Sequence, residues 1–139
     1  MRVQPPNLTL WLTDYVRLRA EIAGIEVEVD SQEPAELELP LTVPLIVIRD
    51  DSGPRLSHVT FDRSIGASVI GGSRVAPKAL DDLASWLAGL LFDDAIALVE
   101  GSPIASVEWD GCNGPYAVPE SLDAARRYMT AQYTVVGTW

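Results

Sequence analysis

The sequence has very few residues of the kinds that build covalent links or metal sites. Among 139 residues there is one cysteine, Cys112, and one histidine, His58. A lone thiol excludes a disulfide within the chain, and one Cys with one His is too small a set for a zinc site. A calcium site made of carboxylates needs a loop pattern that the sequence lacks. We therefore expect neither a metal nor a cofactor.

Basic residues are scarce too, and long apolar runs are missing. The chain has 10 Lys and Arg against 20 Asp and Glu, so its net charge is −10. Phosphate backbones and anionic lipids are bound through Lys and Arg, so this balance argues against nucleic-acid binding and against membrane docking. No apolar run approaches the roughly 20 residues of a spanning helix. Prolines at positions 5 and 6 interrupt any signal-peptide core, and we interpret the start as cytosolic.

Apolar residues, by contrast, are plentiful. The hydrophobic share is 47% and the charged share 22%, which is typical of a folded protein rather than a disordered one. A chain of 139 residues is long enough for one ordinary domain with its own core. Neither a repeat nor a shift of composition marks an internal boundary, so we predict a single domain over residues 1–139.

A first helix is predicted directly after the two prolines. Asn7 or Thr9 can cap its start, and Gly24 is well placed to end it. Its apolar residues recur at the spacing of one helix face: Trp11, Tyr15, Leu18 and Ile22, with Leu8 and Leu12 alongside.

Residues 75–94 give the strongest helix signal. Pro77 suits a first helical turn, and Asp81 and Asp82 lie early, where the helix dipole favours anions. The apolar residues form one broad stripe: Leu80, Leu83, Leu87 and Leu90, with Ala84 and Leu91. Such a stripe must cover a wide apolar surface.

Alternating and apolar stretches predict the strands. Residues 25–30 alternate strictly, and residues 45–48 are apolar throughout, as in a strand covered on both faces. Odd positions from 59 to 69 are apolar except Arg63, and they predict one long strand, or two strands bent near Arg63. In the closing strand the odd positions share a buried face, namely Met129, Ala131, Tyr133, Val135 and Trp139, while polar Thr130, Gln132, Thr134 and Thr138 share the other.

The stretches between these elements are rich in turn residues. Residues 31–40 hold two prolines and predict a mobile loop with at most a short strand, and residues 112–121 predict turns followed by one helical turn around 122–127. The order helix, strands, helix, strands predicts an α+β fold: a mostly antiparallel twisted sheet with two main helices on one face.

The sharpest catalytic hypothesis is a thiol nucleophile at Cys112, paired with His58. Cys112 lies between Asp-Gly and Asn-Gly, however, which are common hairpin turns, so a structural turn is the competing interpretation. The glycines at 71 and 72 precede a helix but lack the spacing of a phosphate-binding loop. Three acidic pairs fit a turn, a helix start and a helix end: Asp50 with Asp51, Asp81 with Asp82, and Asp93 with Asp94.

Charge placement is uneven. Residues 21–51 contain nine acidic residues and one basic residue, Arg49, whereas Arg126 and Arg127 are adjacent just before the closing strand. One interpretation is a solvated acidic face. The other is a polarised subunit whose acidic surface and basic pair serve assembly, because complementary potentials guide register and partner choice.

Four stretches carry a resemblance to a known family: residues 8–22, 44–53, 74–91 and, most of all, 113–137, where a proline-containing turn and two arginines precede a closing strand. In this layout the chain resembles the tail terminator (tail completion) proteins of long-tailed bacteriophages. The resemblance implies a structural role without catalysis. Family members form hexameric rings that bind the last ring of tail tube protein, stop tube polymerisation and present the surface that joins the head.

The resemblance also implies partners and a location. The expected partners are further copies of the chain, the tail tube protein and a head-tail connector protein, with DNA passing through the ring without specific binding. The expected location is the head-proximal end of the virion tail, reached from the host cytoplasm during assembly. Head-tail connector proteins share size and acidity and are the alternative.

Residue roles follow from the resemblance only in part. Arg126 and Arg127 match the arginine-containing segment before the closing strand, and we nominate them, with Arg74 and Tyr128, as subunit or partner contacts. No catalytic residue is carried over. The terminal Trp139 is a departure from the pattern and indicates an end tucked against its own core or against a neighbour.

Overall fold

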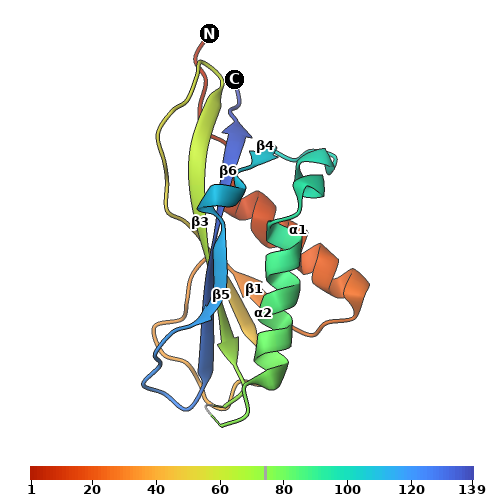
Figure 1. Ribbon diagram of the computed structural model, residues 1–139, viewed down its shortest axis with the longest axis vertical. Helices are drawn as coiled ribbons and strands as arrows, with labels where there is room; N and C mark the ends of the chain where they lie inside the picture. Colours follow the sequence, from red (N-terminus) through yellow and green to blue (C-terminus); the bar gives the residue numbers. More distant parts are fainter. Residues whose placement is uncertain (74) are drawn as a thin grey trace.

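The computed structural model describes residues 1–73 and 75–139 and shows an α+β fold (Figure 1). Two α-helices occur in these residues, α1 (Leu8–Ala23) and α2 (Lys78–Leu91). The strands are β1 (Glu28–Asp30), β2 (Leu45–Asp50), β3 (Thr60–Gly71), β4 (Ile104–Val107), β5 (Asn113–Ala117) and β6 (Ala125–Val136). Two short 3₁₀ helices, η1 (Asp94–Leu98) and η2 (Trp109–Gly111), flank β4.

The strands of the described residues form one mixed sheet in the order β1-β2-β3-β6-β4, and β5 also pairs with β6. Strands β3 and β6, of 12 residues each, pair along their whole length from Thr60 opposite Val136 to Gly71 opposite Ala125. All pairings are antiparallel except β1 with β2. The predicted mostly antiparallel sheet is confirmed, and residues 31–44 supply the roughly dozen residues that the parallel connection needs.

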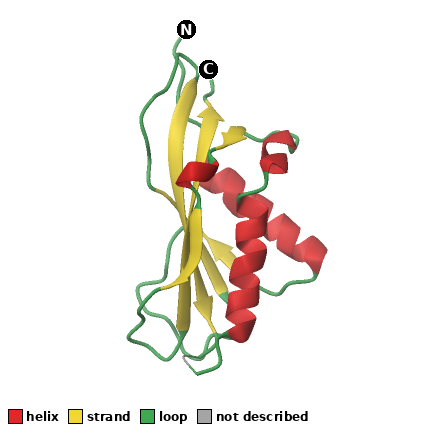
Figure 2. Cartoon of the chain, viewed as in Figure 1, coloured by secondary structure: helices red, strands yellow, loops and turns green. Residues whose placement is uncertain are grey.

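Both helices cover the same face of the sheet (Figure 2). On that face the side chains of the odd positions of β3 and β6 are buried, among them Phe61, Ile65, Met129 and Tyr133. The α2 stripe packs on them with Leu80, Leu83, Ala84, Leu87 and Leu91 buried, as the sequence predicts. The inward face of the closing strand is therefore confirmed from Met129 to Val135.

Strand β2 is covered on both faces, as its apolar run predicts. Ile46 and Ile48 belong to the core beneath the helices. Leu45 faces the opposite way and packs with Ile70 and Ala124 under the leucines of residues 37–41. Strand β3 continues without a break through Arg63, so the long-strand alternative is the correct one.

Helix α1 has the predicted caps but a different buried face. Asn7 accepts a hydrogen bond from the Leu10 amide, and Gly24 ends the helix with φ of +71°. The buried row is Leu8, Leu12, Val16 and Ala20, whereas Leu18 and Ile22 are 53% and 66% exposed. The prediction is correct for Leu8 and Leu12, and Trp11 and Tyr15 pack partly buried against the core. It was wrong for Leu18 and Ile22, because two neighbouring rows share the helical period and the aliphatic row faces the sheet.

Three local predictions are wrong. Residues 122–127 form no helical turn, because Arg126 and Arg127 pair with Ile70 and Val69 as part of β6. The turn-rich stretch contains strand β5, which uses the free edge of β6. Trp139 is 71% exposed instead of sharing the buried face, since β6 ends at Val136.

The Tyr133 hydroxyl gives a direct test of how α2 is held to the sheet. It is fully buried and donates to the Leu91 carbonyl at the end of α2, with an oxygen-oxygen distance of 2.6 Å. Tyr133→Phe leaves that carbonyl without its partner, and we expect a loss of about 1–2 kcal/mol in the free energy of unfolding.

Urea denaturation measures this loss. Tyr116→Phe is the matched control, because it removes the same hydroxyl from a residue that is 44% exposed. Equal shifts in the two variants would contradict the assigned role of the Tyr133 hydroxyl.

Candidate functional site

Three of the four residues nominated from the sequence lie in succession on β6 and point in alternate directions. Arg126 and Tyr128 lie on the open face of the sheet, away from the helices, and Arg127 lies on the helix face between them. Arg74, the fourth nominated residue, is outside the residues that the structure describes. The structure therefore brings Arg126 and Tyr128 together and separates Arg127 from both.

Arg126 joins two loops to the sheet. Its side chain is 17% exposed, and its guanidinium donates to Glu33 at 2.6 Å and to Glu120 at 2.9 Å. Burial acts to lower the pKa of Arg126, but the bonds to the two carboxylates outweigh it and raise the pKa. The hydrogen bond from Arg126, helped by the Leu122 amide, in turn lowers the pKa of Glu120.

Arg127 joins α2 to the sheet from the other face. Its side chain is 15% exposed and its Nε donates to Asp81 at 2.6 Å. Asp81 lies in the first turn of α2, where a carboxylate also interacts favourably with the helix dipole. The early aspartate that the sequence assigns to the helix start thus has a second role.

The Tyr128 side chain reaches over Gly66 on the open face. A Cβ on Gly66 would meet its hydroxyl oxygen at 2.0 Å, so only glycine leaves room for the phenol there. Arg49 donates to that oxygen at 2.7 Å and pairs with Asp51 at 2.6 Å, and the Tyr116 ring packs edge-on against Tyr128. Burial raises the pKa of Tyr128, while the bond to Asp51 raises the pKa of Arg49.

Arg126, Tyr128 and Arg49 border a hollow of about 230 Å³ on the open face. Both guanidinium groups are already neutralised by carboxylates of the same chain, so the hollow offers an anion little net charge. The hollow is a polar surface whose side chains are held in place by ion pairs within the chain. Glu33, Glu120 and Arg49 were missed by sequence reasoning, because no periodic pattern signals a contact between residues 33 and 126.

Other side chains on the open face of β6 are also hydrogen-bonded to carboxylates of the chain. Gln132 donates to Asp62 of β3 at 2.9 Å, and Thr134 donates to Glu108 at 2.9 Å. The hydroxyls of Ser106 and Thr134 lower the pKa of Glu108. The polar face that the sequence predicts for the closing strand is therefore a hydrogen-bonded surface.

Cys112 does not have the surroundings of an activated thiol. It is half-buried beside the core, and its Sγ lies 3.5 Å from the Glu108 carbonyl oxygen. Burial raises the pKa of the thiol, opposite to the depressed pKa of a catalytic cysteine. His58 lies elsewhere, in the loop before β3, where its carbonyl accepts a hydrogen bond from Arg55.

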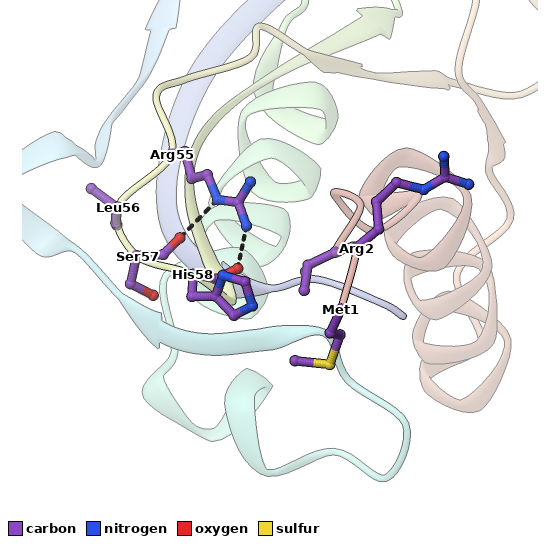
Figure 3. Close-up of a pocket in the computed structure, with 7 residues that line it drawn as sticks. Met1, Arg2, Arg55, Leu56, Ser57 and His58 are labelled. Atoms are coloured by element: carbon purple, nitrogen blue, oxygen red, sulfur yellow. Dashed lines mark hydrogen bonds between the residues drawn. The ribbon is translucent and has the colours of Figure 1, made fainter.

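His58 belongs to a second surface at the end of the sheet where the two chain termini lie (Figure 3). A shallow hollow of about 660 Å³ is lined there by residues 1–3 and 55–58. Arg55 donates to the carbonyl of Ser57 at 2.9 Å and lies 5.2 Å from the Phe61 ring, so its charge is held in place. Arg2 extends away from the hollow (Figure 3).

Neither a comparison with known protein families nor one with curated proteins finds a match for this chain. In residues 1–73 and 75–139 no cluster of three His, Cys, Asp or Glu side chains is arranged to hold a metal ion. Neither helix of that part of the chain has the length and apolar character to cross a membrane.

The Glu120–Arg126 bond makes stability depend on pH. The folded-state pKa of Glu120 is below its ordinary value of 4.5, so its contribution is complete above that value and is lost as the pH falls through the folded pKa. Glu120→Gln should therefore reduce the free energy of unfolding by about 1–2 kcal/mol at neutral pH.

The effect of the same substitution should shrink as the pH falls through the lowered folded-state pKa of Glu120, because the carboxyl of the parent chain then becomes protonated as well. Chemical denaturation at several pH values provides the measurement. Glu100→Gln, at an exposed glutamate, is the control. A loss of stability that does not shrink at all as the pH is lowered below 4.5 would contradict the assignment.

Proposed function

We propose that this chain is a structural protein of a bacteriophage tail. Copies of it form a ring that caps the tail tube, ends tube polymerisation and presents the surface for joining the head. The proposal rests first on residues 113–137, the stretch with the strongest resemblance to tail terminator proteins. These residues contain β5 and β6, and β6 pairs with three other strands, β3, β4 and β5.

The observation that carries an assembly role is the exposure of large apolar side chains on several faces. Leu98 is 86% exposed, Trp109 is 64% exposed, and Leu18 and Ile22 continue the outer row of α1. Single exposed leucines are ordinary, but an exposed tryptophan and an outer helix row favour protein contacts, because aromatic residues are enriched at interface cores. A ring subunit needs such surfaces toward both neighbours and toward the tube.

The acidic composition also suits this role. With a net charge of −10, the chain would line a passage that repels the DNA phosphate backbone. DNA then moves through the ring without binding to it. A head-tail connector protein would share this property, so the two virion roles differ in the protein that the ring contacts.

Tube capping is the decisive measurement. Tail tube protein is allowed to polymerise while light scattering records growth, and the chain is added after growth has begun. We expect growth to stop at an amount of chain far below that of tube protein, because only tube ends need to be capped. Electron microscopy should then show shorter tubes, each with a ring at one end.

An unrelated acidic protein of similar size serves as the control for a charge effect. Tubes that keep growing and carry no ring would sink the terminator assignment. Rings that bind a head-tail connector protein but leave tube growth unchanged would favour the connector role.

A further inference from the structure

The two ends of the molecule differ in charge. The end opposite the termini is acidic and contains a hollow. We call residues 31–44 the acidic loop; it lies toward the end opposite the termini (Figure 1). Glu36 and Glu38 of this loop border a hollow of about 350 Å³ that is lined by Leu37, Leu41 and Leu45. The ion pairs of the described residues include neither Glu36 nor Glu38.

The opposite end carries positive charge and apolar side chains. We call residues 1–4, 53–60 and 136–139 the basic tip. Backbone hydrogen bonds join these segments, between Gln4 and Thr138 and between Gly137 and Val59. The tip contains Arg2 and Arg55 and not one of the 20 acidic residues of the chain. Met1, Leu56 and Trp139 of the tip are 73%, 54% and 71% exposed.

Arg2 is a charge of this end that lies outside the ion pairs. It takes part in no ion pair among the described residues, and Figure 3 shows its side chain reaching away from the hollow beside it. Arg55 is fixed by the carbonyls of its own loop. The tip therefore presents one free and one anchored guanidinium next to apolar side chains.

These two surfaces match but cannot meet within one chain. The tip adjoins the Thr60–Val136 end of the β3–β6 ladder, and Leu45 beside the acidic loop pairs with Ile70 near the other end. A strand rises about 3.3 Å per residue, so a ladder of 12 pairs separates them. Any contact between them joins two molecules.

We propose that the basic tip of one copy docks on the acidic loop of the next copy. Arg2 and Arg55 face Glu36 and Glu38, and the apolar side chains of the tip enter the leucine-lined hollow. The contact uses different surfaces of the two copies, and a contact of that kind closes into a ring when its rotation permits. The inference rests on the proposed function and adds the surface by which the ring closes.

The same reasoning separates this contact from Arg126 and Arg127. Those arginines are 17% and 15% exposed and are occupied by carboxylates of their own chain. A neighbouring molecule gains little from a charge that is already neutralised and largely covered. The free charges at the ends are the ones that can guide one copy onto another.

Charge reversal at each end tests the contact. Arg2→Glu changes the tip, and the double variant Glu36→Lys with Glu38→Lys changes the acidic loop. We expect either change alone to weaken self-association roughly tenfold or more, since like charges then oppose each other. Sedimentation velocity and mass photometry over a concentration series provide the measurement.

Mixing the two variants in equal amounts should restore association. The reversed tip of one variant then meets the reversed loop of the other, and the native tip meets the native loop, so every contact in an alternating ring is complementary. A contact between identical surfaces would not be restored in this way. Added salt should weaken association of the parent chain, because exposed charges are screened.

Matched controls carry the same charge changes on α1 and the turn after it. Arg19→Glu, and Glu21→Lys with Glu26→Lys, alter exposed residues outside both ends. These variants should associate like the parent chain. Unchanged melting temperatures will show that all the variants are folded.

The outcomes separate this inference from the proposed function. End variants that associate like the controls, a mixture that stays dissociated, or a parent chain that is monomeric at every concentration would overturn the docking contact. End variants that fail to associate yet still cap tail tubes would overturn it too. Association with the expected rescue but without tube capping would refute the terminator role and leave the docking contact standing.

Discussion

The pairing of β3 with β6 is the constraint on which the rest of the structure depends. Their 12-residue ladder assigns every side chain of both strands to one of two faces, because successive residues in a strand point in opposite directions. A shift of one residue would send Met129 and Tyr133 to solvent and bring the threonines into the core. The ladder also leaves one edge of each strand free. Strand β2 uses the edge of β3, and β4 and β5 share the edge of β6.

Because of this ladder, two arginines that are adjacent in the sequence contact distant parts of the chain. As strand neighbours, Arg126 and Arg127 hold opposite sides of the molecule: the first binds the loops that carry Glu33 and Glu120, and the second binds Asp81 of α2. Partly buried ion pairs add little net stability because desolvation offsets their attraction, but losing one partner is costly. Their main effect is therefore to specify where the loops and α2 sit. This accounts for two arginines with little exposure in a chain that has few basic residues.

The sequence predicts elements where a single periodicity dominates and fails where two signals compete. Helix α2 and the inward face of β6 have one strong apolar period, and both were predicted. In α1, the row ending in Ile22 and the row ending in Ala20 share the helical period, and only the packing on the sheet decides that the second is buried. The helical turn expected around Arg126 fails because long-range pairing with β3 overrides local propensity. The contacts of Arg126 join residues 93 positions apart, and no local pattern announces them.

Arginine side chains in the middle of the molecule are mostly paired within the chain, whereas some charges at its ends are not. Around the ladder nearly every arginine has a partner. Arg49 pairs with Asp51, and Arg63 donates to the Gly53 carbonyl and pairs with Asp50. Arg126 and Arg127 pair with the carboxylates described above. Pairing within the chain neutralises these charges. They therefore fix the arrangement of the subunit and contribute little to the electrostatic potential outside it. Charges outside the ion pairs of the described residues occur at both ends of the long axis, with Arg2 at one end and Glu36 and Glu38 at the other, beside exposed or partly exposed apolar side chains. A surface that combines unpaired charge with exposed apolar area recovers both when it is covered, because burial removes apolar area from water and complementary charge fixes the orientation. The residues that shape the fold and those available to join copies of it are thus different arginines, and a conspicuous basic pair in the sequence indicates the former.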